Sequence, residues 1–262
     1  MSCLPSNEKE LSMKSGLKKA VSLILIFVIA HSIPVLARLI AQLIDYSFIL
    51  SDPMRELAYM FVTYTLQVAL AILAIKLLVT RRLPDAGFNL QNKAESMKLF
   101  RRFTLAWTGI LVVFYAVALT LMPSFLDYLR SFCPPDALYG VKNVVGGSML
   151  AGLGEEPLFR GLVLLFLAKH WQGDIRIGKL KLTHASLITG FIFMTAHIGY
   201  VFVPRFEIVH FDALQLCYTL VLGITWSHML EKTGSLLAPV LSHIWANFIQ
   251  YALAYVTVFV LF

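Results

Sequence analysis

Two adjacent acidic residues lie in the middle of an apolar stretch, GLGEEPLFRGLVLLF, which contains Glu155 and Glu156. A charge at the centre of a bilayer costs about 2.5–3.5 kcal/mol even on a lenient insertion scale, so carboxylates in such stretches are functional by default. Arg160 follows Glu156 by four residues, which predicts a supporting ion pair on one helix face. Glu155 lies about 100° around the helix and has no local partner. We therefore interpret Glu155 as the functional carboxylate.

Two histidines lie inside other apolar stretches, His197 and His243. Asn247 follows His243 by four residues in HIWAN, so both side chains project from one helix face, which indicates a common target. Phe193 precedes His197 by four residues, and an aromatic residue there is expected to pack in the ordinary way. His31, a lone histidine in the first apolar stretch, is predicted to be packed and hydrogen-bonded.

A carboxylate, two histidines and an amide can activate water and bind an oxyanion. Glu or His takes a proton from water as general base, and His and Asn donate hydrogen bonds to the tetrahedral intermediate of acyl transfer. This set indicates amide hydrolysis inside a membrane. Zinc is the alternative use, with Glu155, His197 and His243 as ligands. The sequence has no HExxH motif, and Asn is a poor zinc ligand, so the residues favour metal-free hydrolysis. It also has no G-x-S-x-G motif that would support a covalent mechanism.

The composition indicates that these residues are positioned by transmembrane helices. Of the 262 residues, 58% are hydrophobic and 14% charged, whereas an average soluble domain has about 25% charged residues. The mean hydropathy is +0.76. This composition excludes a disordered chain and a soluble nucleic-acid binder, and the three scattered cysteines exclude a secreted disulfide scaffold. We expect no nucleic-acid partner.

We predict an all-α polytopic membrane bundle of seven to eight transmembrane helices, because a helix that crosses the hydrocarbon core needs about 20 apolar residues. The seven candidate spans are 20–43, 57–79, 103–122, 146–168, 185–203, 212–229 and 236–262. The mixed stretch 124–145 is predicted to lie at the membrane interface. Residues 1–19 are expected to form a polar cytoplasmic tail, and residues 20–262 a single transmembrane domain.

The basic residues predict the orientation of the chain. Of the 22 Lys and Arg residues, 15 lie in the tail, in the loops 80–102 and 169–184, and at Lys232, and four lie on the opposite side of this map. Cytoplasmic loops of membrane proteins carry an excess of Lys and Arg. We therefore predict a cytoplasmic N-terminus and, with seven spans, an external C-terminus. The net charge of +7 then reflects topology.

The ordered motifs resemble the CPBP family of intramembrane proteases, also called the Abi or CAAX protease family. The EExxxR motif of that family is present as Glu155–Arg160, its FxxxH motif as Phe193–His197, and its HxxxN motif as His243–Asn247. The resemblance covers about 145–250, which would be the motif-bearing core of a transmembrane protease domain. The N-terminal half matches only as generic membrane helices.

The resemblance implies a role for each motif residue. Glu155, helped by His197, would activate water, and His243 and Asn247 would bind the oxyanion. The supporting positions are Glu156, Arg160 and Phe193. The resemblance favours a glutamate-dependent mechanism without a cofactor, and zinc stays as the alternative.

The resemblance also implies the partners and the location. The substrate would be a membrane-anchored protein or peptide in a lipid bilayer, and a C-terminal tail is the kind we favour. The short chain with its dense spans indicates a multi-pass protein of a prokaryotic inner membrane. Two other classes stay open, a non-catalytic immunity or scaffold protein and an ion-coupled transporter. A transporter would be expected to have paired halves, and the sequence has no inverted repeat.

Overall fold

The structure is a computed structural model that describes residues 6–49, 51–134, 136–178, 180–201 and 207–261. Its α-helices are α1 (Ser6–Ala41), α2 (Asp52–Leu78), α3 (Lys93–Leu121), α4 (Phe125–Phe132), α5 (Ala137–Lys142), α6 (Ala151–Glu156), α7 (Leu165–His170), α8 (His184–Thr195), α9 (Ala213–Thr233) and α10 (Leu237–Val256). A 3-10 helix, η1 (Leu83–Ala86), and three π-helical segments, η2 (Asn143–Leu150), η3 (Pro157–Leu164) and η4 (Thr257–Leu261), join them. Two antiparallel hairpins are formed by β1 (Asp174–Ile177) with β2 (Leu180–Thr183) and by β3 (Gly199–Val201) with β4 (Glu207–His210).

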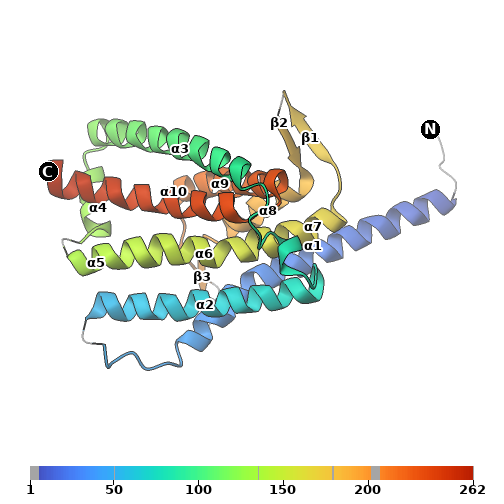
Figure 1. Cartoon of the computed structure of the whole chain (residues 1–262), viewed down its shortest axis with the longest axis horizontal. Helices are drawn as coiled ribbons and strands as arrows, with labels where there is room; N and C mark the ends of the chain where they lie inside the picture. Colours follow the sequence, from blue (N-terminus) through green and yellow to red (C-terminus); the bar gives the residue numbers. More distant parts are fainter. Residues whose placement is uncertain (1–5, 50, 135, 179, 202–206, 262) are drawn as a thin grey trace.

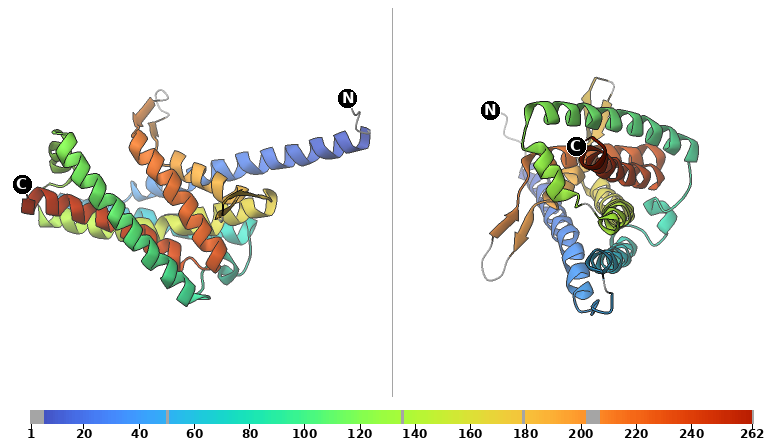
Figure 2. Two further views of the ribbon diagram at one scale, coloured as in Figure 1. Left: turned by 90° about the horizontal axis from the view of Figure 1, so that it is seen from above. Right: turned by 90° about the vertical axis from the view of Figure 1, so that its left-hand side faces the viewer.

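The two ends of the chain lie at opposite ends of the bundle (Figure 1), and α3 and α9 cross the other long helices at a steep angle (Figure 2). The run from α5 to α7 lies between α2 and α10, and α3 covers the far side of α10 (Figures 1 and 2). Helix α1 packs on α2 and α7, and α8 packs on α9. The run that carries the two adjacent glutamates is therefore enclosed by other helices, as the all-α prediction requires.

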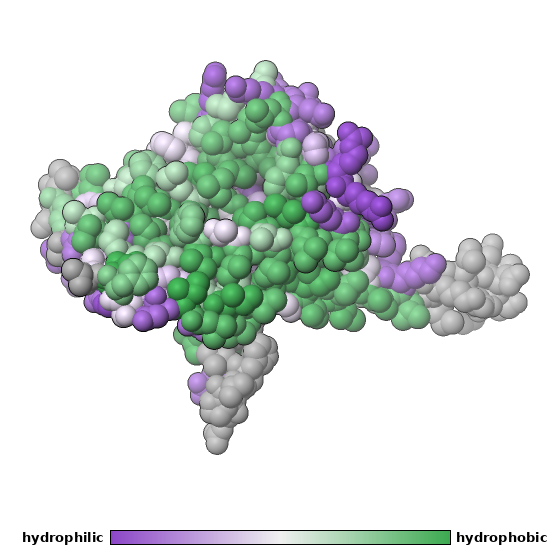
Figure 3. Space-filling model, turned by 60° about the horizontal axis from the view of Figure 1, so that its bottom comes forward, coloured by the Kyte–Doolittle hydropathy of each residue, from purple (hydrophilic) through white to green (hydrophobic). Residues whose placement is uncertain are grey.

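Among the residues that the structure describes, four helices are long and apolar enough to cross a membrane: Gly16–Ala41, Asp52–Leu78, Lys93–Leu121 and Ala213–Thr233. They correspond to the predicted spans 20–43, 57–79, 103–122 and 212–229. Hydrophobic side chains cover most of the middle of the face drawn in Figure 3, and hydrophilic ones gather toward its right-hand end and its lower left edge. This distribution suits a protein whose middle contacts lipid.

The predicted span 146–168 lies in a continuous helical run from α5 through η2, α6, η3 and α7. Its turns alternate between α and π geometry, and the two glutamates end the short α6 between two π-helical segments. Pro157 directly follows them and has no backbone N–H to continue an α-helical ladder. The last predicted span, 236–262, is formed by α10 and η4, apart from residue 262, which lies outside the described residues.

The predicted span 185–203 is wrong. Helix α8 has 12 residues and ends at Thr195, which gives it a length of about 18 Å at 1.5 Å per residue, too short for a hydrocarbon core of about 30 Å. The chain then turns into β3 instead of continuing as a helix. Residues 202 and 203 of this predicted span lie outside the described residues. Helix α8 begins where the Thr183 hydroxyl accepts a hydrogen bond from the Ser186 backbone N–H, an N-cap.

The structure describes most of the predicted N-terminal tail. Helix α1 begins at Ser6, so from there the segment 1–19 is helical; residues 1–5 lie outside the described residues. The predicted interfacial stretch 124–145 contains α4, α5 and the start of η2. His31 in α1 is hydrogen-bonded to the Phe27 carbonyl oxygen at 2.9 Å and to the Thr195 hydroxyl at 3.3 Å, which confirms the prediction for this histidine.

Helices α8 and α9 cross at two glycines. A Cβ atom at Gly223 would lie 3.0 Å from the Cα of Gly190 and 3.1 Å from Cδ1 of Phe193. The missing side chains let the two backbones approach closely, which brings Phe193 and the Gly223 carbonyl to the centre of the bundle.

The positions of the two ends lead to a topology prediction. Because they lie at opposite ends of the bundle (Figure 1), we expect them on opposite sides of the membrane, with the N-terminus in the cytoplasm on the basic-residue pattern. Reporter fusions that are active on only one side should give opposite signals at residues 1 and 262. Equal signals at both ends would contradict this topology.

Candidate active site

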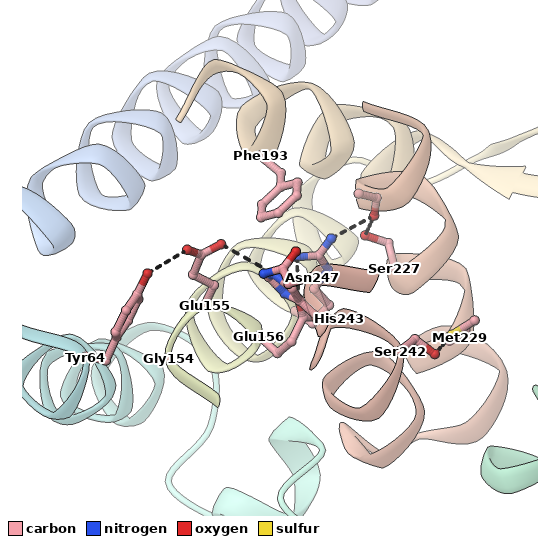
Figure 4. Close-up of polar contacts among 12 residues, drawn as sticks. Tyr64, Gly154, Glu155, Glu156, Phe193, Ser227, Met229, Ser242, His243 and Asn247 are labelled. Carbon is pink, nitrogen blue, oxygen red and sulfur yellow. Dashed lines mark hydrogen bonds and ion pairs between the residues drawn. The ribbon is translucent and has the colours of Figure 1, made fainter. Parts of the chain in front are cut away.

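The two adjacent glutamates of α6 lie in different surroundings. The Glu156 side chain is 0% exposed, and its Oε1 accepts hydrogen bonds from Arg160 Nη1 at 3.1 Å and from His243 Nδ1 at 2.7 Å. The Glu155 side chain is 20% exposed. Its Oε1 accepts a long bond from the Tyr64 hydroxyl at 3.5 Å, and its Oε2 lies 3.9 Å from His243 Nε2, too far for a hydrogen bond. Glu156 is therefore held by its partners, while Oε2 of Glu155 has only the long contact with His243 (Figure 4).

Arg160 is fully buried, and the predicted ion pair with Glu156 is present. Its Nη2 also donates to the Gly223 carbonyl oxygen at 3.1 Å. The guanidinium lies 4.6 Å from the ring centre of Phe193 and 5.2 Å from that of Trp226. An arginine is suited to this setting because its planar cation stacks on aromatic faces and is weakly hydrated. Arg160 thus joins η3 to α8 and α9.

His243 is fixed between a carboxylate and an indole. Its Nδ1 donates to Glu156, because a carboxylate only accepts. Its ring stacks on Trp226, with the centroids 4.3 Å apart and the planes 18° apart. These contacts direct Nε2 toward Glu155. In the doubly protonated ring, Nε2 carries a second N–H that can donate to an oxyanion.

Asn247 and His197 have one anchoring bond each. Asn247 Nδ2 donates to the Gly147 carbonyl oxygen at 2.9 Å, and because an amide nitrogen has two N–H groups, a second donor remains. Figure 4 shows Asn247 beside His243, and both side chains come from α10. His197 Nδ1 donates to the Phe193 carbonyl oxygen at 2.8 Å, so its Nε2 is the lone-pair nitrogen of the neutral ring.

Phe193 has more contacts than ordinary packing of α8 would need. Its ring lies 4.7 Å from the ring of His197, 5.8 Å from Trp226 and 6.0 Å from His243, in addition to the guanidinium of Arg160. The structure therefore brings the three motifs together around this ring. Within the described ranges, His197 forms no hydrogen bond or ion pair with Glu155.

Two residues of α2 reach this site, and the sequence patterns did not single them out. Tyr64 contacts Glu155, and Gln67 Nε2 donates to the Gly154 carbonyl oxygen at 3.0 Å. The nearest signal in the sequence is the presence of a tyrosine and a glutamine three residues apart in an apolar span, which places them on one face.

The zinc alternative gains no support from the side-chain grouping. Within the described ranges, no group of three or more His, Cys, Asp or Glu side chains is placed to hold a metal ion. Two ring nitrogens of the proposed ligand set are already committed, Nδ1 of His243 to Glu156 and Nδ1 of His197 to Phe193. Metal content is a matter for direct measurement.

The buried Glu156, Arg160 and His243 and the long apolar helices define an integral membrane protein with a polar site inside its helical bundle. Residues 137–249 match a family model described as type II CAAX prenyl endopeptidase Rce1-like. This match confirms the resemblance of residues 137–249 to the CPBP/CAAX protease family. No curated protein and no solved structure matches the chain. The family supports CAAX-type endopeptidase activity on membrane-associated proteins.

Proposed function

We propose that this protein is a glutamate-dependent intramembrane endopeptidase that hydrolyses a peptide bond in a membrane-anchored C-terminal tail, without a metal. The family match supports the reaction class. The observation that carries the mechanism is the difference between the two neighbouring glutamates. Glu156 is completely buried and its Oε1 is bound by both Arg160 and His243, whereas Glu155 has a partly exposed carboxylate whose Oε2 accepts no hydrogen bond from His243.

Glu155 is the general base in this mechanism. Its Oε2 takes a proton from a water molecule while the water oxygen attacks the carbonyl carbon of the scissile bond. His197 supports this step with its lone-pair Nε2, which accepts a hydrogen bond from the same water. The side chains that face Glu155 are held by packing and hydrogen bonds, so the base meets the water in a defined direction.

His243 and Asn247 stabilise the oxyanion that forms when water attacks. Nε2–H of the doubly protonated His243 ring and the second N–H of Asn247 donate to the negatively charged oxygen. The tetrahedral intermediate then collapses, the C–N bond breaks, and the proton held by Glu155 passes to the leaving amine. Glu156 and Arg160 do not touch the substrate; they hold His243 and join the helices around it.

The test uses purified full-length protein in lipid, with a lipid-anchored peptide whose cleavage products are identified by mass spectrometry. We expect cleavage to continue after chelation and elemental analysis to find no stoichiometric zinc. Asn247→Ala should reduce kcat by about 10²–10³-fold, the usual effect of removing one oxyanion donor. One zinc per chain, with activity lost on chelation and restored by zinc, would make Glu155 and the two histidines ligands and overturn the metal-free mechanism.

The two alternatives, a non-catalytic scaffold and an ion-coupled transporter, are tested in the same preparation. Either one predicts no cleavage, and the scaffold also predicts that a Glu155→Ala strain keeps the phenotype of the wild type. A comparison of the membrane proteomes of wild-type and Glu155→Gln strains would find the natural substrate as a protein that keeps its terminal segment in the variant.

A further inference from the structure

Helix α2 supplies two polar side chains to the turn of α6 that carries Glu155. The Tyr64 hydroxyl donates to Glu155 Oε1 at 3.5 Å. Gln67, which is 3% exposed, donates from Nε2 to the carbonyl oxygen of Gly154 at 3.0 Å. Residues three apart lie on one helix face, so both contacts come from the face of α2 that packs on α6. Figure 4 shows Tyr64 reaching Glu155 from the side opposite to His243.

Gly154 allows this close approach. A Cβ atom at this position would lie 2.3 Å from Cδ1 of Tyr64 and 2.9 Å from its Cγ. The tyrosine ring therefore packs directly on the α6 backbone, one residue before Glu155. The same contact that places the ring also places the hydroxyl, and Gln67 holds the same backbone through its hydrogen bond to the Gly154 carbonyl oxygen.

The two oxygens of Glu155 then face in different directions. Oε1 faces the Tyr64 hydroxyl, and Oε2 faces His243 Nε2. A glutamate side chain has several rotatable bonds, and ordering it costs free energy. A donor on one oxygen fixes that rotamer before the substrate arrives. Hydrogen bonds in substrate-free sites are often long and shorten in the complex, which agrees with the 3.5 Å distance.

We propose that Tyr64 is a positioning residue for the reaction, which holds Glu155 by its Oε1 so that Oε2 is presented to the water beside His243. This inference rests on the proposed function, in which Glu155 is the base. Gln67 and Gly154 keep the tyrosine ring packed against the turn that carries this carboxylate.

Another buried tyrosine offers a matched control. Tyr115 is 7% exposed and donates its hydroxyl to the Gln250 carbonyl oxygen at 3.2 Å. Tyr64→Phe and Tyr115→Phe thus remove the same atom and one hydrogen bond each. A merely structural role for Tyr64 predicts similar effects of the two variants, because only the acceptor differs.

The kinetic test compares the pH profiles of wild type and the two variants. For Tyr64→Phe we expect kcat to fall by about 10- to 100-fold, the factor for a lost hydrogen bond to a charged group, with little change in KM. The acid limb of the profile should also move to higher pH, because the lost donor favours the charged form of the carboxyl that acts as base. Tyr115→Phe should leave the limb in place.

A second pair of variants tests the contact through the backbone. Gly154→Ala forces the ring of Tyr64 away, so it should move the acid limb as Tyr64→Phe does. The double variant Tyr64→Phe/Gly154→Ala should move the acid limb no further than either single variant, because both changes remove the same interaction. Gly109→Ala in α3 is the control, since a Cβ there meets nothing within 4 Å.

Infrared spectroscopy tests the inference without a measurement of enzymatic activity. The carboxylate stretching band that Glu155→Gln removes should shift in frequency in Tyr64→Phe and stay unchanged in Tyr115→Phe. If Tyr64→Phe leaves this band and the acid limb where wild type has them, the inference is overturned even if kcat falls. If wild type cleaves no peptide but the band shifts, Tyr64 positions Glu155 and the proposed function alone has failed.

Discussion

Glu155→Gln should abolish peptide hydrolysis while leaving the bundle folded. The amide keeps the shape of the side chain but cannot take a proton from water, and the loss of a general base lowers the rate by about 10²–10⁴-fold. The partial exposure of Glu155 and its long contacts mean that little of the fold depends on its charge. The measurement is kcat on the lipid-anchored peptide, together with the melting temperature of the same preparation.

Glu156→Gln is the matched control, since it makes the same chemical change one residue further along. Glu156 is completely buried against Arg160 and His243, so this variant should lower the melting temperature, which Glu155→Gln should not do. If Glu155→Gln kept wild-type turnover while Glu156→Gln lost it at full stability, the assignment of the two roles would be reversed.

Arg160→Ala should produce the largest loss of stability. It leaves the Glu156 carboxylate buried without its cationic partner, and breaking a buried pair in this way typically costs about 3–5 kcal/mol. The aromatic contacts with Phe193 and Trp226 and the bond to the Gly223 carbonyl are lost at the same time. Thermal unfolding in detergent or lipid, followed with protein yield, measures the effect.

Arg130→Ala is the control for that variant. Arg130 forms an exposed ion pair with Asp127 at 3.5 Å, also within one helix, and exposed pairs contribute only about 0–1 kcal/mol. Its removal should hardly change the melting temperature. An Arg160→Ala protein with wild-type stability and no activity would move Arg160 from support of the fold to a direct part in the chemistry.

The long helices could be predicted because length and hydropathy determine whether a segment crosses a membrane. Helix α8 could not, because the residues after Thr195 stay apolar, and hydropathy alone does not tell a continuing helix from a strand. Composition likewise gave no signal for the π-helical segments, and the helical start of the polar N-terminal segment was missed for the same reason.

In the candidate site, residue spacing predicted the contact within one helix but not the contacts between residues far apart in the sequence. The pair of Glu156 and Arg160 follows from an i, i+4 spacing, and the ion pair is present. Tyr64 lies 91 residues from its partner Glu155 along the chain, so no spacing rule connects them. The contacts of Phe193 with both histidines likewise depend on how α8, α9 and α10 pack.

The π-helical turns on both sides of the glutamate pair make its direction depend on the number of residues as well as on their types. A π turn closes over one residue more than an α turn. A π turn can lose one residue by closing as an α turn, whereas removal of Leu153 from the α-helical α6 would rotate Glu155 by about 100° relative to the residues before it. Such a chain would keep every side chain of the site and yet direct Glu155 away from His243. Insertions and deletions in this run are therefore expected to be tolerated less than many substitutions, a constraint on the length of the chain that no motif written as residue types contains.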